Sequence, residues 1–400
     1  MKNGLLGLLL LALLLAVGCK KNSTPAPQQI TIGALLSLSG NGSSLGLTSQ
    51  KAISLAITDV NNYMELTGAN FRFVSEVYDT KLDPAIALQG MNEMAAKQTR
   101  YIIGPQTSAE LTAIKPVADS KNMLVVSQAS TASSLAIAND GIFRFCPGDV
   151  VEGAAIANSM YSEGKRVVVT LSRDDVGNKG LQNSVGIAFS GLGGQVDAIP
   201  AYATTLTNYS ALLATLKTKL QTYISTQGAN NVAVYLASFE EAVVLFRQAA
   251  PDPLFASVKW YGGDGVVLSA ALPADATAAA FAAATKFIAP NFGLPALQHP
   301  DFTRVNTAIK TTTGIEAEAY TMAAYDAVWV LANTVLATSN VSSDYTKIKS
   351  AFQTEAGKHF GITGPLLLNT AGDRSTGSFD YWGIVLEAGI YKWKLVGKSL

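Results

Sequence analysis

Short apolar runs alternate with amphipathic stretches along most of the chain. Each run has the length of a strand and is followed by a turn rich in Gly, Ser or Asp and then by residues with helical spacing. Strands that are apolar throughout are buried on both faces, as in parallel sheets covered by helices. We therefore predict an α/β fold with doubly wound parallel sheets, whose clearest strands are residues 30–37, 71–77, 101–104, 123–127, 166–171, 231–236 and 258–261.

The length of 400 residues exceeds one typical domain and favours two such lobes. We expect the chain to pass between them three times, near residues 143–145, 287–289 and 364–365. The first lobe would then contain residues 30–145 and 287–363, and the second residues 146–286 and 364–400. The alternating stretch 379–396 predicts a hairpin that turns at residues 387–389.

The first nineteen residues have the layout of a bacterial lipoprotein signal. A basic start is followed by an apolar run from Leu5 to Val17, then by small residues and Cys19. The run is shorter than the roughly 20 apolar residues that cross a bilayer. We predict a signal peptide over residues 1–18, a lipid on Cys19 and a flexible tether over residues 19–29, which place the protein outside the cytoplasm on a membrane.

Composition narrows the possible partners. Lys plus Arg equals Asp plus Glu at 29 each, and no basic run is present, which argues against nucleic acid. Once Cys19 carries a lipid, Cys146 stands alone, so we expect no intramolecular disulfide and a small buried side chain. His299 and His359 have no ligand-spaced neighbours, and we predict neither a metal site nor a cofactor.

Residues 42–46 match the G-x-S-x-G pattern of serine esterases, with Ser44 as the nucleophile. In that fold the oxyanion loop comes from earlier strands, and here only signal and tether precede the first strand. The loop is also long rather than a tight turn, and neither histidine has a recognisable acidic partner. We treat an esterase as a remote alternative.

The loops after the buried strands are better candidates for binding, because ligands of open α/β sheets lie at the carboxyl ends of the strands. Residues 104–108 and 127–131 each follow such a strand, and Ser108 opens a helix whose free N–H groups suit a carboxylate. Asp264 follows a third strand and could meet an ammonium group. Helix capping explains Ser108 and Asp264 equally well.

Several blocks, in this order and spacing, resemble the leucine/isoleucine/valine-binding protein family, the type I periplasmic binding proteins of branched-chain amino acid ABC transporters. The resemblance extends from Ile30 to about Gly397. Its blocks are residues 30–34, 38–40, 57–61, 78–79, 83–84, 103–105, Ser108, Tyr320, 324–327, 361–365 and 372–373.

The resemblance implies a two-lobed fold with a three-strand hinge and a role for several residues. Ser108 is similar to the serine that binds the ligand's carboxylate, and the loop of Ala129, Ser130 and Thr131 to the segment that contacts both charged ends. Asp264 stands where the family often has a glutamate that neutralises the ammonium.

Three positions depart from the tyrosines that close relatives often carry, namely Leu45, Val176 and Phe239. A pocket with these residues offers fewer hydroxyls, so we expect an apolar ligand side chain, branched or aromatic.

The resemblance thus implies a solute-binding lipoprotein without catalytic activity. It would bind one amino acid as a monomer by closing its lobes, and deliver it to an ABC permease in the membrane. Alternatives are a binding protein for an amide, urea or aromatic acid, and a ligand sensor.

Overall fold

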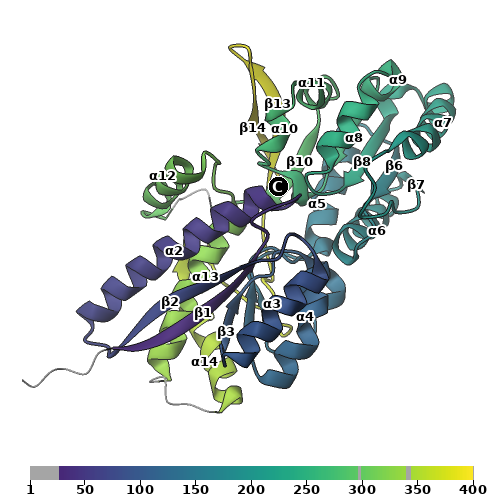
Figure 1. Ribbon diagram of the computed structural model, residues 1–400. Coiled ribbons are helices and arrows are strands. Elements are labelled where there is room, and N and C mark those ends of the chain that lie inside the picture. The colour runs from purple at the N-terminus through teal and green to yellow at the C-terminus, as the bar shows by residue number, and fades with distance from the viewer. Residues whose placement is uncertain (1–26, 296–298, 339–343, 400) are drawn as a thin grey trace, which may run out of the picture.

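The computed structural model describes residues 27–295, 299–338 and 344–399. The expected signal peptide, Cys19 and the tether up to residue 26 lie outside these residues. Within them the chain forms two lobes, each built on its own largely parallel sheet with helices on both faces (Figure 1). The predicted fold class, α/β with two parallel-sheet lobes, is confirmed.

The sheet of the first lobe has five parallel strands in the order β2-β1-β3-β4-β5. Its helices come from both ends of the sequence, because α12, α13 and α14 return to it after the second lobe (Figure 1). The elements are β1 (Gln28–Leu36), α2 (Ser43–Leu66), β2 (Phe71–Asp79), α3 (Pro84–Ala96), β3 (Tyr101–Ile103), α4 (Ser108–Lys121), β4 (Leu124–Ser127), β5 (Ile142–Arg144), α12 (Phe302–Thr313), α13 (Ala319–Ala337) and α14 (Tyr345–Lys358).

Local signals set the starts of two helices in this lobe. The Asp83 side chain accepts the N–H groups of Ala85 and Ile86, so the expected cap before α3 is present. Helix α4 is capped by Thr107, which forms a capping box with Glu110.

Helix α2 begins at Ser43, five residues before the helical pattern that the sequence suggested from Thr48. A glycine explains this start, because Gly46 packs directly against the end of β1. A Cβ atom there would lie only 1.8 Å from the carbonyl oxygen of Ser37. The last glycine of the G-x-S-x-G pattern therefore serves helix–strand packing.

The sheet of the second lobe has seven strands in the order β14-β13-β10-β9-β8-β6-β7. Strands β7, β6, β8, β9 and β10 are parallel, whereas β13 and β14 form the expected antiparallel hairpin, with positive φ at Ala388 and Gly389 in its turn. The elements are α5 (Asp149–Ser162), β6 (Val167–Ser172), α6 (Val176–Gly191), β7 (Gln195–Ala198), α7 (Ser210–Gln227), β8 (Val232–Ala237), α8 (Ala242–Ala249), α9 (Pro253–Ala256), β9 (Lys259–Gly262), α10 (Ala271–Ala274), α11 (Ala276–Ala284), β10 (Ile288–Phe292), β13 (Phe379–Glu387) and β14 (Ile390–Lys398).

Two of the three crossings lie later in the sequence than we expected. Residues 288–292 form β10 within the second sheet, so the chain leaves that lobe after Phe292 rather than at 287–289. Residues 364–365 pair with β11 (Phe360–Gly361) as β12 (Gly364–Pro365), and Ile362 belongs to the first core, so the third crossing follows residue 374. The second and third crossings touch through the N–H of Gly293, which donates to the carbonyl of Ser378 at 2.7 Å.

Candidate functional site

A cavity lies between the lobes, where loops at the carboxyl ends of strands from both sheets meet. It measures about 60 Å³, enough for about five water molecules. Its walls are Asn41, Gly42, Ser44, Leu45, Gln106, Thr107, Ser108, Ala129, Thr131, Glu318 and Tyr320 from the first lobe, and Gly177, Asn178, Leu181, Phe239, Glu240, Asp264, Gly265, Val267 and Ser269 from the second.

Six of the eight ligand-contacting residues expected from sequence line this cavity: Leu45, Ser108, Ala129, Thr131, Phe239 and Asp264. The other two do not. The Ser130 hydroxyl hydrogen-bonds that of Ser108 at 2.9 Å and so supports the wall from behind. Val176 packs against the core beneath α3 and α4, which leaves the adjacent Gly177 at the cavity.

Ser108 does not cap its own helix, because another residue does. With Thr107 as the cap of α4, the Ser108 hydroxyl faces the following strand-end loop and accepts the N–H of Ala132 at 3.1 Å. An ideal Cβ at Gly177, across the cavity, would lie 3.4 Å from the Ser108 oxygen. The lobes are therefore in contact at this point.

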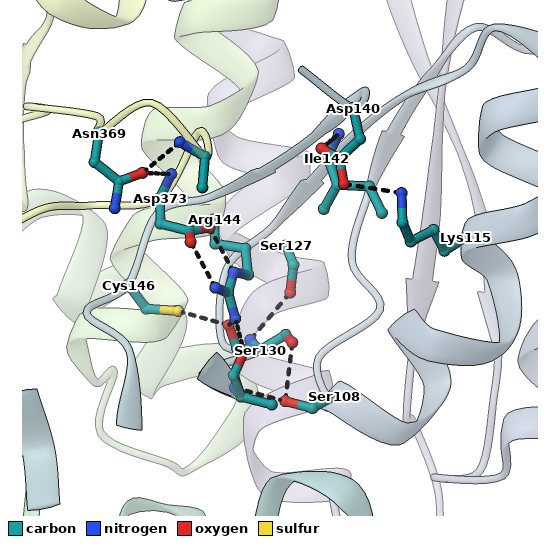
Figure 2. Close-up of polar contacts among 12 residues, drawn as sticks. Ser108, Lys115, Ser127, Ser130, Asp140, Ile142, Arg144, Cys146, Asn369 and Asp373 are labelled. Atoms are coloured by element: carbon teal, nitrogen blue, oxygen red, sulfur yellow. Dashed lines mark hydrogen bonds and ion pairs between the residues drawn. The ribbon is translucent and has the colours of Figure 1, made fainter. Parts of the chain in front are cut away.

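A buried ion pair holds the loop that carries Ala129 and Thr131. Figure 2 shows the Arg144 guanidinium between Asp373 and this loop. Its Nε donates to Asp373 Oδ1 at 2.5 Å and its Nη2 to Oδ2 at 2.6 Å, while Nη1 donates to the carbonyl of Ala132 at 2.6 Å. Asp373 lies just before the third crossing between the lobes. Through Arg144, this crossing segment therefore holds the loop in place.

Cys146 also contacts the loop that Arg144 holds. Its thiol is buried and donates to the carbonyl of Ser130 at 3.3 Å (Figure 2). Burial raises the pKa of this thiol far above its ordinary value. The expected small buried side chain is confirmed.

On the opposite wall, Asp264 lies two residues after the end of β9 and is held by two contacts. Its carboxylate accepts the hydroxyl of Tyr320 at 2.7 Å, and its own N–H donates to Glu152 at 3.1 Å. Burial raises the pKa of Asp264 to about 6, even though the hydroxyl of Tyr320 acts in the opposite direction. This carboxylate is placed to meet a positive charge in the cavity.

The sequence did not identify two further acidic residues in the walls, Glu240 and Glu318. Glu318 is buried, and Asn291 donates to its carboxylate; burial, together with the charges of Asp264 and Glu240, raises its pKa to about 8. A glutamate next to a helix start also interacts favourably with the helix dipole. The local sequence therefore does not distinguish a glutamate that stabilises a helix from one that lines a cavity. Among the described residues that line the cavity, none is Lys, Arg or His.

Ser44 joins the lobes across the rim of the cavity. Its hydroxyl donates to Glu240 Oε1 at 2.5 Å and accepts the N–H of Ala270 at 3.0 Å. His299 and His359 line a different cavity, beside Asp326. The structure therefore does not bring a histidine to the serine of the G-x-S-x-G pattern.

The described residues also lack two other kinds of feature. No group of three or more His, Cys, Asp or Glu side chains is arranged to hold a metal ion. No helix there combines the length and apolar character needed to span a bilayer.

Comparison with known proteins supports this architecture. The family model described as "Receptor family ligand binding region" matches residues 48–387. Leu/Ile/Val-binding protein homolog 1 of Brucella suis is 24% identical over 348 residues, which cover 86% of this chain and 87% of the relative.

Solved structures show the same fold. A leucine-binding protein from Thermotoga maritima superposes with a TM-score of 0.71 at 21% identity, covering 92% of this chain and 98% of the other. A solute-binding protein from R. palustris in complex with benzoate also gives 0.71, at 16% identity, covering 92% and 96%. Since the family model spans well over half of the sequence, the chain belongs to the family described as "Receptor family ligand binding region" and has the two-lobed fold of type I periplasmic binding proteins.

Proposed function

We propose that the protein is the solute-binding component of an ABC importer and captures a free α-amino acid between its lobes. One observation carries the proposal. A hydroxyl at a helix N-terminus, Ser108, and a half-buried carboxylate, Asp264, face one cavity from opposite lobes. This pairing matches the two charged ends of an amino acid.

Each end of the ligand has suitable partners in this arrangement. The carboxylate would lie at the start of α4, where free N–H groups and the helix dipole favour an anion, beside Ser108 and Thr131. The ammonium would meet Asp264. Leu45 and Phe239 form an apolar wall for the side chain, and covering a branched or aromatic side chain there contributes roughly 1.5–3 kcal/mol.

Lobe closure completes the site in this proposal. The contacts of Ser44 with Glu240 and Ala270 join the lobes when they are closed. The cavity is small, so a bound amino acid would hold the lobes slightly further apart than they lie here. The closed form would then be the one that a membrane permease recognises.

The aromatic-acid alternative is less favourable on electrostatic grounds. The R. palustris neighbour is in complex with benzoate, an anion without a cationic group. Here such a ligand would enter a cavity lined by Asp264, Glu240 and Glu318 and leave these carboxyl groups without a cation.

The anchoring and assembly of the protein are part of the same proposal. The signal sequence and Cys19 support a lipid-tethered, extracytoplasmic protein that works as a monomer beside its permease. Mass spectrometry of the N-terminal peptide tests the anchor, since a Cys19→Ser variant would lack the added lipid mass.

A thermal-shift screen of the purified full-length protein tests the ligand class. It would include the twenty amino acids, a panel of amides and benzoic acids. A ligand at 100 times its Kd stabilises by about 2.7 kcal/mol. We expect amino acids to raise the midpoint, Asp264→Asn to remove the shift, and the exposed Asp174→Asn to retain it. A shift by benzoic acids alone would contradict the proposal.

A further inference from the structure

The cavity holds more carboxyl groups than the single ammonium of one amino acid could pair with. Three carboxyl groups line it, those of Glu240, Asp264 and Glu318, and the described lining contains no basic side chain. A zwitterionic ligand brings one ammonium group, which Asp264 would take, and one carboxylate, which adds negative charge. Glu240 and Glu318 would remain without a cation.

Arg144 and Arg173 lie near the cavity but cannot supply this charge, because both are already paired with carboxylates. Arg144 forms its two-pronged contact with Asp373. Arg173 lies over the ring of Phe239 and is paired with Asp175 at 3.1 Å and with Glu241 at 3.3 Å.

Further carboxyl groups behind the wall increase the negative potential. Asp149 and Glu152 are buried, one oxygen of the Glu152 side chain lacks a hydrogen-bond partner, and repulsion from Asp264 acts on both groups. Buried carboxylates are stable when a cation is near them and otherwise hold a proton. A cationic ligand therefore gains more in this cavity than a neutral one of the same shape.

Glu318 is the best-placed partner for a second cation. It is buried, it lines the cavity together with Asp264 and Glu240, and the charges of both act on it. Asn291 orients its carboxylate through Oε2. Glu240 has a further role, because Ser44 and Ser269 both donate to its Oε1.

We propose that the preferred ligand is a diamino acid, an α-amino acid whose aliphatic side chain ends in a second ammonium group held by Glu318 and Glu240. This inference rests on the proposed amino-acid function and narrows it. The methylene stem would cover Leu45 and Phe239, while the terminal cation reaches the two glutamates. An apolar wall and acidic groups in one cavity suit such a side chain better than a purely branched one.

Isothermal titration of the full-length protein with matched ligands tests the inference. Ornithine and norvaline share a stem and differ in the terminal ammonium, as do lysine and norleucine. We expect the diamino acid of each pair to bind at least about tenfold more tightly, a difference of about 1.4 kcal/mol. Equal or tighter binding of norvaline and norleucine would overturn the inference and leave the amino-acid function intact. If no amino acid binds, the proposed function fails and the inference fails with it.

Variants assign the effect to particular residues. Glu318→Gln should lower ornithine affinity to about that of norvaline and leave norvaline binding unchanged, whereas Asp264→Asn should weaken both ligands. Urea unfolding of each variant shows whether it folds, and the matched ligand pairs test the inference on the parent protein without any variant. A Glu318→Gln protein that keeps the full ornithine preference would overturn the assignment.

Discussion

The buried pair between Arg144 and Asp373 allows a quantitative test of how the loop of Ala129 and Thr131 is held. The two side chains are only 2% and 7% exposed. Asp373→Asn keeps the size of the side chain but leaves the Arg144 guanidinium buried without a counter-ion. Breaking a buried pair in this way costs about 3–5 kcal/mol, because the remaining charge stays desolvated. The same change should loosen the loop of Ala129 and Thr131, whose neighbouring carbonyl Arg144 holds.

Urea unfolding followed by circular dichroism measures this loss in the free energy of unfolding. Thermal unfolding gives a second measure. In a unit of 150–250 residues each kcal/mol lowers Tm by about 2–4 °C, so Asp373→Asn should lower Tm by about 6–20 °C. Glu65→Gln is the matched control, because it removes the exposed pair with Arg72, whose side chains are 68% and 45% exposed, and should cost less than about 1 kcal/mol.

A paired replacement separates charge from packing. Arg144→Met combined with Asp373→Leu leaves no buried charge and should be more stable than Asp373→Asn alone. The reasoning is refuted if Asp373→Asn lies within about 1 kcal/mol of the parent protein.

Three further predictions follow from packing and burial. Gly46→Ala should lower the free energy of unfolding by at least about 1–3 kcal/mol, because its Cβ would lie 1.8 Å from a carbonyl oxygen. Gly357→Ala is the control, because Gly357 has open space around it in α14. In the same urea titration this change should raise the free energy of unfolding by up to about 1 kcal/mol. The Cys146 thiol, in a Cys19→Ser background, should not react with a thiol reagent until the protein is unfolded, since it is buried and its pKa is raised; rapid native labelling would contradict its placement. Without ligand, the free energy of unfolding should fall as pH rises from about 4 to about 8. Burial raises the pKa of Asp264 to about 6 and that of Glu318 to about 8, so the folded state retains protons that the unfolded state loses. Tm measured across this range should decline less steeply in Glu318→Gln than in the parent protein, and equal slopes would count against the burial of this carboxyl group.

The strands and several caps could be predicted from sequence because their signals are local. An apolar run of strand length and an Asp-Pro pair each act within a few residues, as Asp83 shows before α3. Crossings between lobes have no such signal. Residues 288–292 look like any buried strand, and only their pairing with β9 and β13 shows that the chain has not yet left the second sheet.

The residues of the candidate site likewise fall into those that the sequence could predict and those that it could not. Ser108 and Asp264 could be proposed because each follows a buried strand, where ligands of α/β sheets bind. Val176 and Glu318 could not be placed, since their orientation depends on how the lobes meet. Val176 faces a core of the opposite lobe, while Glu318, adjacent to a helix start, enters the cavity because Asn291 of the other sheet orients it.

The division of the cavity between two separate sheets has an evolutionary consequence. Ser108 and Thr131 belong to a lobe whose core differs from the one behind Phe239 and Glu240. Substitutions on one wall can therefore accumulate without disturbing the packing that supports the other. A lineage could keep the first-lobe wall and change the second-lobe wall, so members with nearly identical first lobes can differ in the ligand they prefer.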